Sequence, residues 1–126
     1  MINLTSGRIV LDNIDLATLK GSIVRERVIC LTQDPFLFPS SIRLNVDPEA
    51  RYTDEAIVVA FEKVKLWGVL QEKTKNGRSD IASILDTPMD TDFLSHGQRQ
   101  LFCLARALLK PGKVLILDEP TSRLVI

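Results

Sequence analysis

The chain has 126 residues, 45% of them hydrophobic and 25% charged, which is the composition of a globular domain with a core of its own. Sixteen basic residues balance sixteen acidic ones, which argues against a polyanion-binding surface and so against nucleic acid as a partner. No apolar run approaches the roughly 18 residues of a membrane span, and the N-terminus lacks a signal-peptide pattern, so we expect no direct membrane insertion. Cys30 and Cys103 lie in apolar surroundings and are expected to be buried, reduced thiols.

The first part of the chain predicts two strands with a mixed segment between them. Residues 8–12 alternate as a strand does, and Asn13 with Asp15 suits a turn after it. Residues 18–27 predict a short turn or helix. The compact apolar run at residues 28–31 predicts a buried strand rather than a helix.

A polar segment containing Gln33 follows the second strand. The amide of Gln33 both accepts and donates hydrogen bonds, so it is suited to contact a metal ion and orient a water molecule. Pro35 then disfavours helix before it. Residues 39–41 predict the entry to a short helix that a serine caps, and residues 47–48 close it.

The clearest helix begins at Thr53, with two acidic residues in its first turn, where they favour the helix dipole. One apolar stripe at helical spacing consists of Ile57, Ala60, Phe61 and Val64. Residues 66–70 predict a second short helix or turn, and we expect Phe61 and Trp67 to pack in the core. Residues 73–92 are polar and predict a loop, with a brief strand at residues 81–85.

The last helix begins at Ser95, and Gln98 three residues later fits a capping box. A second apolar stripe consists of Leu101, Leu104, Ala105 and Leu108. Residues 111–112 stop this helix, and residues 113–117 predict another buried strand.

Two of these segments carry residues suited to nucleotide chemistry. The first turn of a helix has unpaired N–H groups and a partial positive charge; Gly97 lets a phosphate approach, and the Ser95 hydroxyl donates one more hydrogen bond. Asp118 and Glu119 end an apolar strand, where an aspartate suits Mg²⁺ and a glutamate suits the attacking water. Each motif alone also has a structural explanation, as a capped helix or a capped turn.

Together, these residues resemble the nucleotide-binding domain of ATP-binding cassette (ABC) proteins, and most of all the second cassette of subfamily C (multidrug-resistance-associated) exporters. The resemblance covers about residues 5–124. The matching segments are residues 5–12 after the first helix of such domains, 32–43 for the Q-loop, 94–100 for the signature motif, and 115–122 for Walker B and the D-loop. Several independent motifs in the right order make the resemblance specific.

The resemblance implies an α/β fold: a partial P-loop NTPase (RecA-like) core with an inserted α-helical subdomain. Residues 1–40 and 109–126 would supply core strands and the Q-loop, and residues 41–108 the helical subdomain with the signature helix. The strands before Gln33 and Asp118 would form a parallel pair in this core. The parent would be an ABC transporter that couples ATP binding and hydrolysis to transmembrane export. Its partners would be a second nucleotide-binding domain and the exporter's transmembrane domains, at the cytoplasmic face of a membrane.

The resemblance also implies roles for individual residues, with ATP and Mg²⁺ as cofactors. Ser95, Gly97 and Gln98 would bind the γ-phosphate of an ATP held by the opposite cassette. Gln33 would be a ligand of Mg²⁺ and a catalytic residue, and it would couple the γ-phosphate and Mg²⁺ to the transmembrane domain. Asp118 would hold Mg²⁺, and Glu119 would be the catalytic base.

Three departures from the family pattern bear on activity. There is no Gly-x-x-x-x-Gly-Lys-Ser/Thr loop (Walker A), no switch histidine, and no aspartate in the D-loop, where Val125 stands in its place. We therefore expect the isolated chain to be an inactive ATPase, either marginally stable and aggregation-prone or dependent on a partner. One alternative is a non-catalytic interaction module that completes a partner's ATP site in trans. The other, a soluble ABC ATPase of DNA repair or translation, is disfavoured by the neutral charge and the sequence around Gln33.

Overall fold

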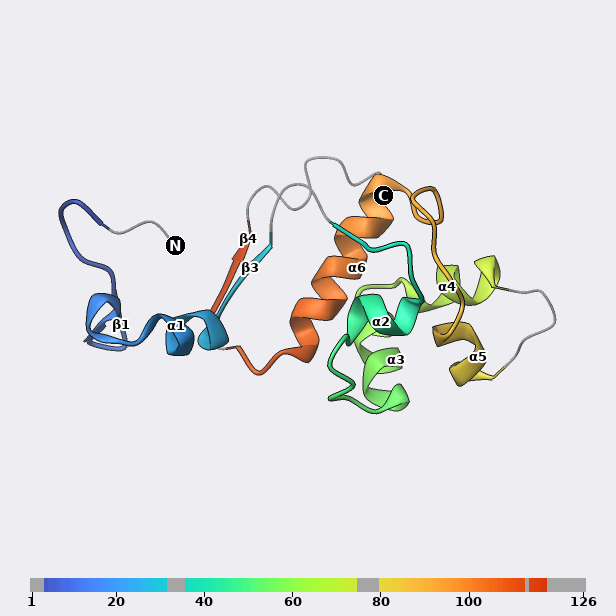
Figure 1. Cartoon of the computed structure of the whole chain (residues 1–126), viewed down its shortest axis with the longest axis horizontal. Coiled ribbons are helices and arrows are strands. Elements are labelled where there is room, and N and C mark those ends of the chain that lie inside the picture. The colour runs from blue at the N-terminus through green and yellow to red at the C-terminus, as the bar shows by residue number, and fades with distance from the viewer. Residues whose placement is uncertain (1–3, 32–35, 75–79, 113, 118–126) are drawn as a thin grey trace.

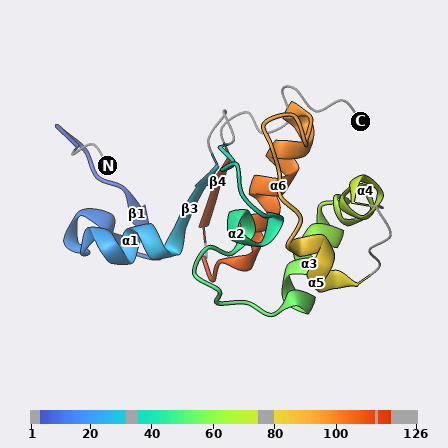
Figure 2. The same ribbon diagram turned by 45° about the vertical axis from the view of Figure 1, so that its right-hand side comes forward.

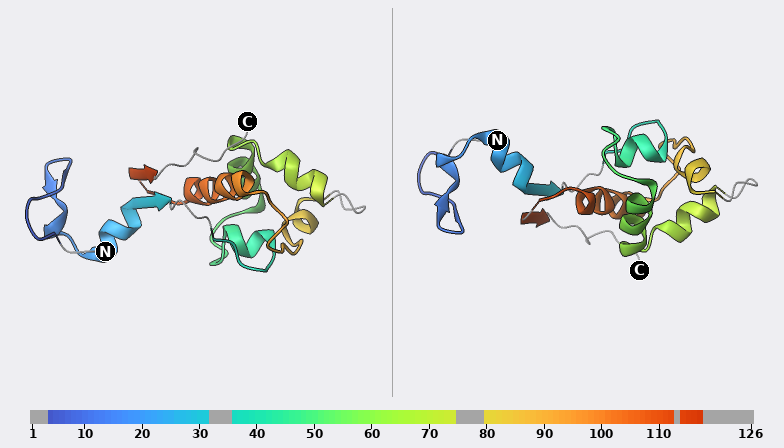
Figure 3. Two further views of the ribbon diagram at one scale, coloured as in Figure 1. Left: turned by 90° about the horizontal axis from the view of Figure 1, so that it is seen from above. Right: turned by 90° about the horizontal axis from the view of Figure 1, so that it is seen from below.

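The computed structural model describes residues 4–31, 36–74, 80–112 and 114–117. Helices form a body at one end of the molecule, and an N-terminal hairpin with a short helix lies at the other (Figures 1 and 3). The body contains α2 (Ile42–Val46), α3 (Asp54–Lys63), α4 (Trp67–Lys73), α5 (Ile81–Leu85) and α6 (His96–Leu109). The remaining elements are β1 (Val10–Leu11), β2 (Ile14–Asp15), a 3-10 turn η1 (Leu16–Thr18), α1 (Gly21–Arg27), β3 (Val28–Leu31) and β4 (Val114–Leu117).

A two-stranded parallel sheet connects the two ends of the molecule. β3 pairs with β4 in the register Val28↔Val114 through Leu31↔Leu117, which confirms the predicted parallel pair. The expectation that β3 is fully buried is wrong, because its residues are half-buried or exposed. Cys30 lies opposite Ile116 on one sheet face, and Ile116 is 50% exposed, so no described layer covers that face.

The N-terminal hairpin follows from local turn chemistry. β1 and β2 pair antiparallel across Asp12 and Asn13, whose φ values of 49° and 63° suit the tight two-residue hairpin turn. Asp15 then accepts the Ala17 N–H at 2.9 Å and caps η1. The predicted turn is confirmed, the strand is confirmed only for two residues, and the turn or helix expected after it appears as η1 and α1.

The hydrophobic core lies in the helical body. Thr53 caps α3 by accepting the Ala56 N–H at 3.3 Å, and the predicted apolar stripe of this helix is buried. Phe61 stacks on Trp67 with ring centroids 6.4 Å apart and meets Phe102 of α6 at 5.0 Å. The packing of α3 against α6 therefore confirms the core role predicted for Phe61 and Trp67. The stripe predicted for α6 is wrong at Leu108, which is 46% exposed.

The brief strand predicted at residues 81–85 is instead the helix α5. Asp80 accepts the Ser83 N–H at 3.0 Å and supplies a local N-cap. Ile84 and Leu85 are buried against the core. A single helical turn satisfies both the cap and the burial of these adjacent residues, whereas a strand would place them on opposite faces.

Arg43 joins three helices of the body. Its Nη2 donates to Asp54 at 3.2 Å at the start of α3, and its Nε donates to Asp86 at 2.8 Å after α5. These carboxylates raise the pKa of the guanidinium, and the hydrogen bond from Arg43 holds the pKa of Asp54 below its usual value of 3.8. The clamp fixes α2 relative to α3 and α5.

Candidate functional site: the first turn of α6

The first turn of α6 is organised by a capping box, as predicted. The Ser95 hydroxyl oxygen accepts the Gln98 N–H at 3.2 Å, and the Gln98 side-chain oxygen accepts the Ser95 N–H at 2.9 Å. Both bonds form between residues three apart, so they depend only on local sequence. The box fixes the side chains of two residues that we predicted would bind phosphate.

The capping box uses acceptor atoms and leaves donors available. The Ser95 hydroxyl keeps its hydrogen, and the Gln98 amide keeps both of its N–H groups. The N–H groups of His96 and Gly97, at the first two helical positions, have no intrahelical acceptor. Ser95 is exposed, while Gly97 and Gln98 are half-buried, so an anion from solvent reaches this turn. Donors and helix dipole together form an arrangement that favours a phosphate oxygen.

Two further nitrogen atoms lie buried in this turn. His96 Nε2 and Arg99 Nε are buried and have no hydrogen-bond partner within the described residues. The His96 ring is half-buried and turns its Nε2 into the protein. Arg99 was not singled out from the sequence; it adds a cation one turn after Ser95 and so reinforces the preference for an anion.

The other predicted site residues, Gln33, Asp118 and Glu119, lie outside the described residues. The strands that precede them in sequence are described, and they run parallel with Leu31 opposite Leu117. Both strands therefore end at the same edge of the sheet. Figures 1 and 2 show that α6 begins on the same side of the molecule, the upper side in both views, as that towards which the two strands run.

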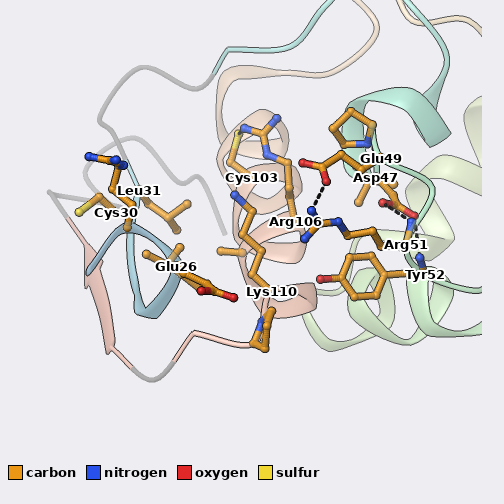
Figure 4. Close-up of a pocket in the computed structure, with 16 residues that line it drawn as sticks. Glu26, Cys30, Leu31, Asp47, Glu49, Arg51, Tyr52, Cys103, Arg106 and Lys110 are labelled. Atoms are coloured by element: carbon orange, nitrogen blue, oxygen red, sulfur yellow. Dashed lines mark hydrogen bonds and ion pairs between the residues drawn. The ribbon is translucent and has the colours of Figure 1, made fainter. Parts of the chain in front are cut away.

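A separate cavity lies towards the opposite end of α6 (Figure 4). Its volume is about 430 Å³, and its walls come from α1, β3, the segment after α2 and the second half of α6. Most acidic groups on its wall already have a partner within the protein. Asp47 accepts the backbone N–H groups of Arg51 and Tyr52 at 3.0 and 2.9 Å, and Glu49 forms an ion pair with Arg51. The charges present therefore do not indicate a ligand.

Both cysteines line this cavity, but they differ in exposure. Cys103 is buried as predicted, and burial raises the pKa of its thiol, an effect that the nearby Arg106 opposes. Cys30 is exposed, so the prediction that it is buried is wrong. The reason is its position on the uncovered face of β3. Both thiols are free.

The first turn of α6 and the parallel strand pair both lie within the region that matches a known protein family. A family model described as "ABC transporter" matches residues 1–122. The chain belongs to the ABC transporter family. The ATP-binding domain of this family has a P-loop NTPase fold, and the helix-rich structure with its parallel strand pair is consistent with part of such an α/β domain.

Curated relatives carry matching names. The chain is 44% identical over 122 residues to ABC multidrug transporter B of Aspergillus fumigatus, covering 97% of this chain and 8% of that protein. It is 43% identical over 122 residues to ABC transporter ecdL of Aspergillus rugulosus, covering 97% and 8%. It is 41% identical over 124 residues to ABC transporter C family member 13 of Dictyostelium discoideum, covering 97% and 9%. The chain thus spans less than a tenth of the length of these relatives.

Within the described ranges, no helix is both long enough and apolar enough to cross a bilayer.

Proposed function

We propose that this ABC transporter segment supplies the signature half of a composite ATP site, in which the first turn of α6 binds the γ-phosphate of an ATP held by a second nucleotide-binding domain. One observation carries the proposal: the capping box of Ser95 and Gln98 consumes acceptors and leaves donors at a helix start. These donors need no Walker A loop in the same chain to bind phosphate.

Within this site, Ser95, Gly97 and Gln98 contact the phosphate through the hydroxyl, the backbone N–H and the side-chain amide. Gln33 and Asp118 are proposed as ligands of Mg²⁺, which would neutralise phosphate charge, and Glu119 as the base that polarises the attacking water. The carboxylate and amide oxygens of these residues are of the kind that Mg²⁺ prefers. In the parent transporter, this chemistry would drive export.

The proposed subfamily is C, which the name of the Dictyostelium relative supports, and the proposed position is the second cassette, which rests on the sequence resemblance alone. The proposed division places core strands and Q-loop in residues 1–40 and 109–126, and the helical subdomain in residues 41–108. In support, the members of the buried core cluster run from Ile42 to Ala105. The transmembrane domains of an exporter are proposed as partners, with the segment at the cytoplasmic face of the membrane.

The test is Mg-ATP binding by calorimetry, first with the chain alone and then with an intact cassette that carries its own Walker A loop. We expect no tight binding by the chain alone and tighter binding by the mixture. Ser95→Arg should abolish the gain, because the longer cation fills the turn and removes the hydroxyl donor. Leu108→Arg is the matched control, since it places the same side chain on an exposed position of the same helix.

Two results would contradict the proposal. Tight binding by the chain alone would point to a different nucleotide site. An equal gain with Ser95→Arg would show that the first turn of α6 does not touch the nucleotide.

A further inference from the structure

Asn45 of α2 is a buried side chain that organises backbone outside its own helix. It is 1% exposed, and its Oδ1 accepts the Phe38 N–H at 2.7 Å. Its Nδ2 donates to the carbonyl oxygens of Phe38 and Ser41, each at 3.0 Å. Phe38 belongs to no helix or strand, so the Asn45 amide stands in for the partner that a neighbouring strand would supply.

The same segment is held on its other side by the chain that leads into the signature turn. The Ser40 carbonyl accepts the Met89 N–H at 2.8 Å, and the Ile42 N–H donates to the Thr87 carbonyl at 3.1 Å. Residues 38–42 therefore lie between the Asn45 amide and residues 87–89. Two backbone hydrogen bonds therefore join this segment to the chain that leads to Ser95.

Side-chain packing extends this connection to α6 itself. Phe36 and Leu37 line a small hollow of about 190 Å³ together with Met89, Leu94 and Arg99. Leu94 is the residue directly before the cap, and Arg99 lies one turn after it. Phe36 and Leu37 thus share a hollow with the residues on either side of the α6 cap.

The backbone of Asn45 also forms a hydrogen bond with α6. Its backbone carbonyl accepts a hydrogen bond from Arg106 Nη1 at 3.3 Å. The other Arg106 terminal nitrogen, Nη2, donates to the Cys103 sulfur at 3.4 Å. Asn45 is therefore bonded both to the segment after Gln33 and to the signature helix.

We propose that Asn45 is a positioning residue for the signature turn, one that holds residues 36–41 in place so that the Ser95–Gln98 donors keep the geometry that binds phosphate. The nucleotide part of this inference rests on the proposed function; the positioning part does not. Asn45 itself touches no phosphate. Its loss changes affinity through the backbone of Phe38 and the packing beside Arg99.

The first test needs no substitution. Hydrogen exchange followed by NMR on the full chain should show the Phe38 N–H protected at least tenfold relative to an unstructured peptide, although it lies outside any helix or strand. An unprotected Phe38 amide would overturn the inference.

The second test uses Asn45→Leu, which keeps the size of the side chain and removes all its hydrogen bonds. Leu44→Ala is the control, on the exposed face of the same helix. In Asn45→Leu, the Phe38 amide should exchange about tenfold faster, and the amide resonances of Ser95 to Gln98 should shift, whereas the control changes neither. Faster exchange at Phe38 without any shift at the signature turn would reduce Asn45 to a local structural role and overturn the proposal.

The third test measures Mg-ATP binding by the mixture with an intact cassette. We expect Asn45→Leu to weaken binding about tenfold and Leu44→Ala to leave it unchanged. Unchanged binding by folded Asn45→Leu would refute the positioning role. If the unsubstituted mixture fails to bind, the proposed function fails, while the exchange and resonance measurements still decide the role of Asn45.

Discussion

The hydroxyl group of Ser95 has one observed role, as the acceptor of the helix cap, and one proposed role, as a donor to phosphate. Ser95→Asp keeps an acceptor at the N-cap and adds a negative charge beside the positive end of the helix dipole, but it removes the donor and repels phosphate. Ser95→Ala removes both roles without adding charge. Ser95→Ala should therefore lower stability and Ser95→Asp should not, while both should weaken nucleotide binding.

The magnitudes follow from the geometry of the cap. The Gln98 N–H to Ser95 oxygen distance of 3.2 Å is long, and the site is exposed, so Ser95→Ala should cost about 0.5–1 kcal/mol, or about 2–4 °C in Tm. Ser95→Asp should unfold at the same or a higher urea concentration. A lost hydrogen bond to a charged phosphate is worth about 1.5–3 kcal/mol, so Ser95→Ala should weaken binding by about 10-fold to 150-fold.

Urea unfolding followed by tryptophan fluorescence measures the first effect, and calorimetry with Mg-ATP and an intact cassette measures the second. Loss of stability in Ser95→Asp comparable to that in Ser95→Ala would refute the capping geometry. Retained nucleotide binding in Ser95→Asp would refute the role of this turn as an anion site.

Three further predictions concern the rest of the fold. Phe61→Ala removes a fully buried ring and should lower the free energy of unfolding by about 3–5 kcal/mol in urea; a loss below about 1 kcal/mol would contradict the shared core of α3 and α6. Asp54→Asn should cost at most about 1 kcal/mol at pH 6, because the carboxylate paired with Arg43 is partly exposed. Since the folded pKa of Asp54 lies below 3.8, its contribution is complete above that pH and should shrink as the pH falls further, which urea curves at decreasing pH would show. Mass spectrometry after iodoacetamide treatment at pH 8 should find Cys30 alkylated in the folded chain, and Cys103 only after unfolding; equal rates would contradict the difference in burial.

Elements with a local cap and a long apolar stripe could be predicted from sequence. Thr53 and Ser95 mark the starts of α3 and α6 because their caps form within one turn. α5 could not be assigned correctly, because five apolar or small residues are too few to distinguish helical from strand periodicity. The exposure of Cys30 could not be predicted from sequence either, since it depends on which layers cover the sheet.

The predictable part of the site was its local half. The spacing of Ser95 and Gln98 gave the capping box, because both partners lie in one turn. Asn45 and Arg99 were missed, since their roles arise from contacts between segments distant in sequence. The one available signal was an asparagine beside Val46 within a short apolar helix, where a buried amide requires partners. The roles of Gln33, Asp118 and Glu119 stay predictions.

The core cluster runs from Ile42 to Ala105, whereas the strands of the parallel sheet come from before and after that stretch. Pairing β3 with β4 therefore closes a loop that contains the entire helical body, and the entropy of closure falls once that body has folded. The helices should form first, through contacts nearer in sequence, and the sheet afterwards. If unfolding follows the reverse order, the two strands separate while the helical body stays folded. The strand side of the proposed ATP site is thus the last part to assemble and the first to come apart.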